Sequence, residues 1–333
     1  MSDTHLKQLT RILAAFELRD ATAYQFAGTT ISVATSAGPV PNGQDPLVAS
    51  LQNTLYQHAY SHRFTGGVKE IQTSPSSGDD LTVPLSKANS SRDRWSSGWS
   101  VLHILPTGQI AAKCQNIIRL LWPGEYIAQD AAGAPKPGTR LSLYWKREAT
   151  VLQPGFYFAF GEMVPDHSDE TRVVRFYWHV KAGAAPSLLS AVSNTFNRYQ
   201  VPFRFKFLNR SEFYGRSDAA VLYTARRHFR IASELLAPLY ADLCGGLEAD
   251  TPLFTKVLAP GLSLAEDPGN GESFGMNRCR LLAEAIVDAF RAGQQTVEAR
   301  LQATERRFQD AGFTLTAPYL NPGSNDSYLW PNN

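Results

Sequence analysis

The chain has 333 residues and 43% of them are hydrophobic, which is enough to bury a large core in one domain or in two. Its 32 Lys and Arg residues nearly balance its 30 Asp and Glu residues, and the net charge of +2 argues against nucleic-acid binding through overall charge. We expect no signal peptide, because the N-terminus lacks a basic region followed by an apolar one, and no membrane partner, because no apolar run approaches about 18 residues. Three cysteines without CxxC spacing fit a reducing cytoplasm and no disulfide framework.

The N-terminal part of the chain is predicted to be helical and to end in a polar loop. Apolar residues recur at helical spacing over residues 5–19 and 45–63, and residues 73–98 are rich in Ser, Gly, Asp and Asn. His58 and His62 are spaced like a pair of metal ligands, but no third ligand accompanies them. We therefore expect no metal site there.

The middle of the chain is predicted to be rich in strands. A Pro-Thr-Gly turn separates two strand-like runs, which favours a hairpin, and a loop with two Pro and two Gly follows. We expect residues 1–95 to form an N-terminal region and residues 96–333 an α+β domain, with a mixed or antiparallel sheet and flanking helices. The expected strands cover residues 99–105, 109–121, 140–146 and 155–161, and the expected loop covers residues 130–139.

A strongly basic stretch, residues 172–230, comes next. It contains eleven Lys or Arg residues and two acids, so its formal charge is 11 − 2 = +9 in a chain whose net charge is +2. This concentration of charge predicts an anionic partner. The stretch holds two strand-like runs, residues 173–181 and 201–209, joined by an expected helix over residues 186–199.

Each of these two runs has one apolar and one polar face, because side chains alternate along a strand. If the strands are neighbours, their polar faces form one cationic patch. The alternative is a pair of ordinary strands with solvated outer faces. The apolar faces hold Val174, Phe176, Trp178, Val180, Val201, Phe203, Phe205 and Phe207, and the polar faces hold Arg175, Tyr177, His179, Lys181, Arg204 and Lys206.

The C-terminal third is predicted to be mainly helical. Its most distinctive feature is the glycine-rich turn at residues 268–275, after which a helix begins with Ser273 as N-cap. Backbone N–H groups at such a helix start suit an oxyanion, and Arg278 and Arg280 lie in its first turns. The turn lacks the GxxxxGK[ST] pattern of nucleotide-binding loops. Further helices are expected over residues 224–243 and 294–309.

Four segments of the sequence resemble the Hop A-type type III effector family. They read FYWHVK (176–181), PFRFKFLN (202–209), YGRSDAAVLY (214–223) and PLFTKVLAPGLSLAEDPGNGESFGMNRCRLLAEAI (252–286). The resemblance extends over about residues 99–290. It implies the α+β fold of the bacterial effector phosphothreonine lyases.

The resemblance also implies an activity. Members of this family serve as lyases in the biosynthesis of class V lanthipeptides and thioviridamide-like thioamitides. There, a kinase of the aminoglycoside-phosphotransferase type phosphorylates Ser or Thr of a precursor peptide, and the lyase eliminates phosphate to leave dehydroalanine or dehydrobutyrine. The implied partners are the phosphorylated precursor peptide and this kinase, with which the lyase could form a complex. No cofactor is implied.

β-Elimination needs a base for the Cα proton, an acid for the leaving oxygen and cations around the phosphate. The resemblance implies Lys206 as the base and His179 as the acid. Crowded cations and burial would lower the pKa of Lys206, and Lys181 would stabilise the enolate-like carbonyl. The candidate phosphate-binding residues are Arg204, Arg210, Arg216, Tyr223, Lys256, Arg278 and Arg280, with Asp218 orienting Arg216.

Two other functions stay open from the sequence. A module that binds phosphopeptides without turnover would need the arginines but neither Lys206 nor His179. An effector-like interaction protein would need none of these roles. The presence of Lys206 and His179 on matching strand faces favours the enzyme.

Overall fold

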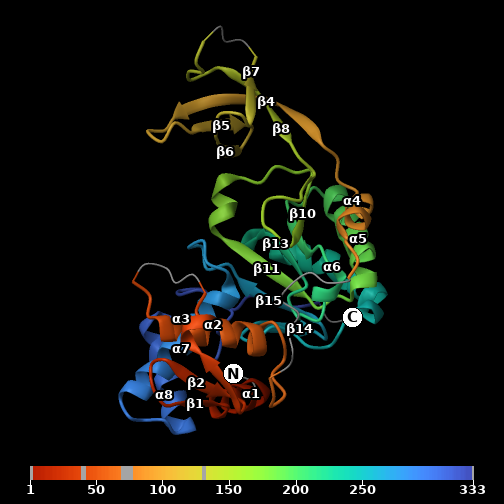
Figure 1. Ribbon diagram of the computed structural model, residues 1–333. Coiled ribbons are helices and arrows are strands. Elements are labelled where there is room, and N and C mark those ends of the chain that lie inside the picture. Colours follow the sequence, from red (N-terminus) through yellow and green to blue (C-terminus); the bar gives the residue numbers. More distant parts are fainter. Residues whose placement is uncertain (1–2, 39–42, 69–77, 130–132, 332–333) are drawn as a thin grey trace.

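The computed structural model describes residues 3–38, 43–68, 78–129 and 133–331. Three antiparallel sheets with flanking helices make up the fold, so the expected α+β class is confirmed. Figure 1 shows a main body and a smaller sheet that projects from it. The main body is built on a seven-stranded sheet in the order β14-β15-β11-β13-β12-β10-β9. Its strands are β9 (Glu148–Ala149), β10 (Phe156–Phe160), β11 (Val173–Trp178), β12 (Arg204–Leu208), β13 (Ala220–Ala225), β14 (Lys256–Ala259) and β15 (Leu262–Glu266).

One face of this sheet packs against α5 (Ala185–Arg198) and α6 (Phe229–Leu243). Phe176 and Trp178 of β11 are fully buried in this core, together with Phe205 and Phe207 of β12. The predicted apolar faces of both strands are therefore confirmed, because a two-residue period sends alternate side chains into one core.

The opposite face of the sheet is covered by the N-terminal elements and by α7 (Phe274–Arg291). Tyr177, Val221 and Ala265 of the sheet share one hydrophobic core with these elements. The polar face is therefore not a solvated surface, and Arg175 and His179 are buried within it. The other elements of this layer are α1 (Asp3–Ala14), β1 (Phe16–Leu18), β2 (Ala23–Phe26), β3 (Thr29–Ser32), α2 (Val33–Ser36), α3 (Pro46–Leu55), the π-helix η1 (Tyr56–Tyr60) and α8 (Val297–Asp310).

The projecting sheet has five strands in the order β6-β5-β4-β8-β7 and its own small core. Trp99, Val101, Leu141 and Leu143 are buried in this core. Its long first strand bends at two bulges, one of which contains Gly98 with φ +83°. The strands are β4 (Arg94–Ile104), β5 (Ile110–Cys114), β6 (Ile117–Leu121), β7 (Tyr126–Ala128) and β8 (Arg140–Trp145).

Four local expectations need correction. The helix expected over residues 5–19 ends at Ala14, and Phe16–Leu18 forms strand β1, because Phe16 and Leu18 are buried on one side of the β1–β2 pair. The stretch expected as one strand over residues 109–121 is two strands, since Gln115 adopts φ 52° and turns the chain. The polar stretch 73–98 contains a helix, α4 (Thr82–Ala88), because Leu85 is buried in the core of the main body. The helix expected from residue 224 begins at Phe229, since β13 runs to Ala225. The parts of the expected loops at residues 73–77 and 130–132 lie outside the described residues.

Short 3-10 helices connect the larger elements. They are η2 (His167–Thr171), η3 (Ala182–Ala184), η4 (Ser211–Phe213), η5 (Arg226–His228) and η6 (Cys244–Gly246). Among the described residues, no helix combines the length and the apolar composition needed to cross a lipid bilayer. The division of the chain at residue 95 stays a prediction.

Candidate active site

The polar face of the seven-stranded sheet brings the two basic strands into shared rows of side chains. β13 lies between β11 and β12, so these strands are not direct neighbours. Residues that pair across antiparallel strands nevertheless point to the same face, and β13 links the two basic strands in register. The rows are Tyr177–Val221–Lys206 and Arg175–Tyr223–Arg204.

His179 lies on the same face as Lys206. It follows Tyr177 by two residues, and its backbone N–H donates to the carbonyl of Gly261 at 2.9 Å, which continues the sheet beyond the end of β11. The carboxylate of Asp218 affects the pKa of both His179 and Lys206. The candidate base and acid therefore face one polar region.

Lys206 holds its ammonium group in an aromatic and cationic environment. The Nζ atom lies 3.6 Å from the centre of the Phe156 ring and 5.8 Å from that of Phe158. It forms no hydrogen bond or ion pair with any described residue. Burial and the nearby guanidinium of Arg216 lower the pKa of Lys206 to about 8, although Asp218 opposes this effect. With this pKa about one tenth of the Lys206 side chains are neutral at pH 7, and only the neutral form can act as a general base.

His179 is 7% exposed, and its ring is oriented by the backbone. Its Nδ1 lies 3.0 Å from the carbonyl oxygen of Asp250. Because a carbonyl only accepts, Nδ1 carries the proton and Nε2 is left to exchange one. Burial lowers the pKa of His179, partly offset by the hydrogen bond to Asp250.

Arg216 is held in place by a carboxylate and a tyrosine. Its Nε and Nη2 donate to the two carboxylate oxygens of Asp218 at 2.8 and 2.9 Å, and Nη2 also donates to the hydroxyl of Tyr56 at 2.9 Å. Burial opposes ionisation of Asp218, but the adjacent guanidinium outweighs it and lowers the pKa of the carboxyl group. These contacts leave Nη1 of Arg216 for another acceptor.

Arg204 offers a second guanidinium on this face. It is exposed and stacks over the ring of Tyr223, at 4.3 Å from the ring centre, without a side-chain hydrogen bond to any described residue. Arg175 approaches the same ring at 5.4 Å and pairs with Asp267 at 2.6 Å. The Tyr223 ring therefore lies between Arg175, which an acid neutralises, and Arg204, whose guanidinium is available to bind an anion.

A model of the HopA1 effector protein family matches residues 148–320, which is just over half of the chain. The chain belongs to the HopA1 effector protein family. The match begins later than the expected residue 99 and extends further, to residue 320.

Two solved structures of HopA1-type effectors are similar to this chain. The effector protein from Pseudomonas syringae pv. tomato strain DC3000 is 24% identical with a TM-score of 0.39, over 50% of this chain and 63% of that chain. The effector protein from Pseudomonas syringae pv. syringae strain 61 is 18% identical with a TM-score of 0.38, over 52% of this chain and 66% of that chain. The chain thus spans less than two thirds of either structure. The comparison with curated proteins finds no significant match.

Most of the cluster on the polar face lies within the HopA1 match, but one member does not. Tyr56 belongs to η1 in the N-terminal layer and reaches Arg216 across 160 positions of sequence. Tyr56 was not predicted from the sequence, and neither Tyr177 nor Arg175 was given a role there. The alternation of residues along the strand predicted that Tyr177 and Arg175 lie on the polar face, whereas no local sequence pattern indicated Tyr56.

Other predicted site residues are engaged by partners of their own. Lys181 is half exposed, and its Nζ lies 3.4 Å from the carbonyl oxygen of Gly245 and 3.7 Å from Glu248. Arg210 donates from Nε to Glu212 at 3.2 Å, next to the segment that begins α4. Each of these cations is therefore neutralised by a nearby acid.

Lys256 lies on the opposite face of the sheet. It pairs with Leu264, whose side chain points into the core beneath α6, and its ammonium binds both carboxylate oxygens of Asp326 at 2.7 Å. The structure does not bring Lys256 to the same face as Lys206, because the register of β14 places it on the other side.

The glycine-rich helix start is also occupied by the protein itself. Ser273 caps α7 by accepting from the backbone N–H of Met276 at 3.2 Å. Arg278 is fully buried and donates to the carbonyl oxygens of Pro318 and Leu320 at 2.7 and 3.1 Å. Arg280 instead forms ion pairs with Glu272 and Glu284. Both guanidinium groups are therefore held by partners within the protein.

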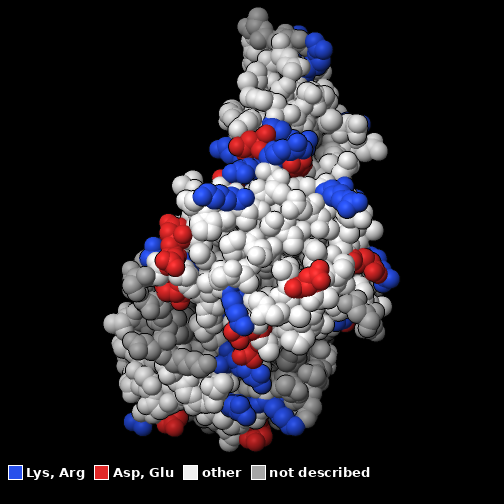
Figure 2. All heavy atoms as spheres, turned by 90° about the vertical axis from the view of Figure 1, so that its right-hand side faces the viewer, with Lys and Arg blue, Asp and Glu red and all other residues white. Residues whose placement is uncertain are grey.

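The charge of the basic stretch is largely paired. Seven of its eleven cations form ion pairs with acids in the described structure, which are Arg175, Lys181, Arg210, Arg216, Arg226, Arg227 and Arg230. On the face drawn in Figure 2, basic and acidic side chains are interspersed and separated by uncharged areas. Of the four cations that remain, Arg204 and Lys206 lie on the polar face of the sheet. Across the described residues, no group of three or more His, Cys, Asp or Glu is arranged to hold a metal ion.

Proposed function

We propose that this protein eliminates phosphate from phosphoserine or phosphothreonine in a peptide, leaving dehydroalanine or dehydrobutyrine. The observation that carries the proposal is the state of Lys206. Its ammonium is partly buried, has no acidic partner in contact and has a pKa lowered to about 8. A buried structural lysine is usually paired with an acid, whereas a base for a weakly acidic Cα proton needs a lowered pKa.

The phosphate site is assigned to Arg204 and Arg216. Arg204 has an unused guanidinium, and Arg216 retains Nη1 while Asp218 and Tyr56 fix its orientation. Guanidinium groups bind phosphate oxygens in a planar, bidentate manner. A bound phosphate dianion would raise the pKa of His179, so the substrate itself would supply the protonated acid.

The proposed reaction proceeds by proton transfers alone. Neutral Lys206 removes the Cα proton, and the electron pair of that C–H bond forms the Cα–Cβ double bond. The Cβ–O bond breaks, and its electrons leave with the phosphate, whose bridging oxygen takes the proton from Nε2 of His179. Lys206 and His179 then exchange protons with water, so no oxidant or reductant is consumed.

The substrate of this reaction must come from phosphoryl transfer to Ser or Thr of a precursor peptide. We assign that step to a separate kinase of the aminoglycoside-phosphotransferase type, on the resemblance of the sequence motifs. We place the pathway of ribosomal peptide maturation in the cytoplasm, since the three cysteines form no disulfide.

The test is loss of phosphoric acid from a synthetic phosphothreonine peptide, followed by mass spectrometry. Lys206→Ala should slow elimination by at least about 100-fold and leave phosphopeptide affinity nearly unchanged, because a base acts mainly in the transition state. Arg216→Ala should weaken both, because a phosphate clamp acts in the ground state as well. Lys181→Ala, at an exposed lysine on the other side of His179, is the control and should retain turnover.

Two outcomes would contradict the proposal. Wild-type turnover by Lys206→Ala would place the base elsewhere. Tight binding without elimination by the wild-type protein, with its full precursor peptide present, would identify a phosphopeptide-binding module instead.

A further inference from the structure

The five-stranded sheet of residues 94–145 lies outside the HopA1 match and carries an unusual share of exposed apolar side chains. Six of the fourteen large hydrophobic residues that are exposed in the described structure belong to it. Soluble proteins seldom gather such side chains without a binding role. The six are Trp95, Leu102, Ile104, Trp122, Ile127 and Tyr144.

Three of these residues form one surface, which we call the aromatic face: Trp95, Ile127 and Tyr144. Trp95 and Tyr144 pair across β4 and β8, with ring centres 5.3 Å apart, and are 55% and 44% exposed. Ile127 pairs with Ser142, two residues before Tyr144, so its side chain points to the same side. Trp and Tyr are the residue types most enriched at the energetic centres of protein interfaces.

Cations flank the aromatic face at both ends. Lys146, two residues after Tyr144, is exposed, and Lys113 lies beyond the other end, where it pairs with Ser100 on the same side of the sheet. The surface therefore complements a partner that is apolar and acidic.

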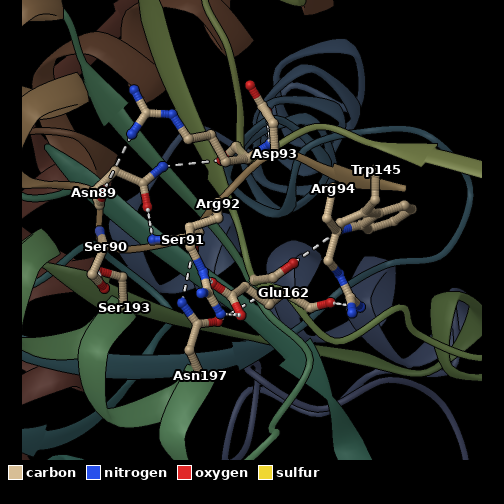
Figure 3. A network of polar contacts seen from close by, with 12 residues as sticks. Asn89, Ser90, Ser91, Arg92, Asp93, Arg94, Trp145, Glu162, Ser193 and Asn197 are labelled. Carbon is tan, nitrogen blue, oxygen red and sulfur yellow. Dashed lines mark hydrogen bonds and ion pairs between the residues drawn. The ribbon is translucent and has the colours of Figure 1, made fainter. Parts of the chain in front are cut away.

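The sheet is fixed to the main body, as Figure 3 shows. Arg92 binds the carboxylate of Glu162 through two hydrogen bonds at 2.9 and 3.1 Å, and the indole Nε1 of Trp145 donates to the carbonyl of Gly161 at 2.8 Å. Arg94 also donates to the carbonyl oxygen of Glu162. The aromatic face therefore has a defined orientation toward the main body.

These contacts join one end of the five-stranded sheet to strand β10 of the main body. Gly161 directly follows β10, whose Phe156 and Phe158 lie beside Lys206 and whose Phe160 pairs with Arg204. Tyr144 adjoins Trp145, which bonds to Gly161. A single peptide could therefore contact the aromatic face and the site together.

We propose that the aromatic face binds an acidic, apolar segment of the substrate peptide, away from its phosphorylated residue. The inference rests on the proposed function for the identity of the partner. Three side chains are too few for a stable dimer, which buries about 800 Å² per partner, but they suit a flexible peptide. Binding at a second point would raise the effective concentration of each phosphorylated residue at the site.

The first experiment measures peptide binding without phosphate. The purified full-length protein is exposed to a resin-bound library of unphosphorylated peptides of random sequence, and the retained peptides are sequenced. Wild type should enrich peptides that combine Asp or Glu with large apolar residues. The variant Trp95→Ser/Tyr144→Ser should lose at least about tenfold in affinity for an enriched peptide, and Lys113→Glu/Lys146→Glu should lose the preference for acids.

The matched control is Tyr199→Ser, which removes an exposed tyrosine at the end of α5. It should bind the enriched peptide like wild type, and circular dichroism should show all variants folded. Equal binding by the double aromatic variant and wild type would overturn the proposal. Dimerisation of the wild type that the same variant abolishes, without peptide selection, would assign the surface to a second copy and would also overturn it.

The second experiment joins the surface to the reaction. A phosphothreonine peptide is compared with the same peptide extended by the enriched segment. Extension should lower KM about tenfold for wild type and Tyr199→Ser, with kcat unchanged, and should have no effect on Trp95→Ser/Tyr144→Ser. If neither wild type nor any variant eliminates phosphate from either peptide, the proposed function fails. Binding of the unphosphorylated peptide still tests whether the aromatic face is a docking surface. An equal gain in the double aromatic variant would refute a role for the aromatic face in the reaction.

Discussion

Replacing Lys206 with methionine should stabilise the folded protein at neutral pH, although it removes the proposed base. Burial lowers the pKa of the Lys206 ammonium from 10.5 to about 8. At about 1.4 kcal/mol per pH unit, holding the proton costs the folded state about 3 kcal/mol when both states are protonated. Methionine has a similar length and no charge. It also loses the attraction to Asp218 and the contact with Phe156, so we expect a net gain of about 1 to 3 kcal/mol at pH 7.

The gain must depend on pH with a definite sign. Below about pH 8, Lys206 is protonated in the folded and the unfolded chain, so wild type bears the full cost. Between about 8 and 10.5, the unfolded chain keeps the proton that the folded chain has released, and wild type gains stability relative to Lys206→Met as the pH rises. Above that window the cost is gone, and the advantage of the variant should disappear.

Urea unfolding of both proteins at about pH 7 and about pH 10, followed by circular dichroism, measures this difference. The control Lys113→Met removes an exposed lysine of the five-stranded sheet and should change stability little at either pH. The rate at which Lys206 reacts with an amine-selective reagent provides a second measurement, and its midpoint should lie at about pH 8. Lower stability of Lys206→Met at pH 7, or an equal difference at both pH values, would refute the account of Lys206 as a destabilised ammonium.

Two further predictions concern Arg216 and Arg278, both candidate phosphate-binding residues of the sequence. Asp218→Asn should lower the free energy of unfolding by about 3 kcal/mol, because it leaves Arg216 without a carboxylate. It should also move the acidic limb of the pH–rate profile to lower pH, because Asp218 raises the pKa of Lys206. If the acidic limb does not move, the ionisation of Lys206 does not set it. Arg278→Leu should lower the free energy of unfolding by about 3 kcal/mol in urea titrations, because the buried guanidinium donates to the carbonyls of Pro318 and Leu320. The folded variant should bind phosphopeptide like wild type. Loss of phosphopeptide affinity without loss of stability would assign Arg278 to the phosphate site.

The sequence by itself determined which side of each basic strand is apolar. Alternation along β11 and β12 requires that Phe176, Trp178 and Phe205 enter one core, and this held because the two-residue period is a property of any extended chain. The same reasoning placed His179 and Lys206 on polar faces. Side-chain contacts between residues close in sequence could also be predicted, such as the hydrogen bond by which Asp218 orients Arg216.

Only the tertiary structure decided what covers the polar face and which cations stay available. The order β11-β13-β12 and the register of β14 depend on pairing between distant segments, which no local pattern encodes, and that register carried Lys256 to the other face. Tyr56 reaches Arg216 from 160 residues away, and Arg278 is buried among C-terminal carbonyls rather than exposed to an anion. A run of basic residues in the sequence shows only where cations lie along the chain. The long-range contacts that bury each cation or pair it with an acid decide which one can react.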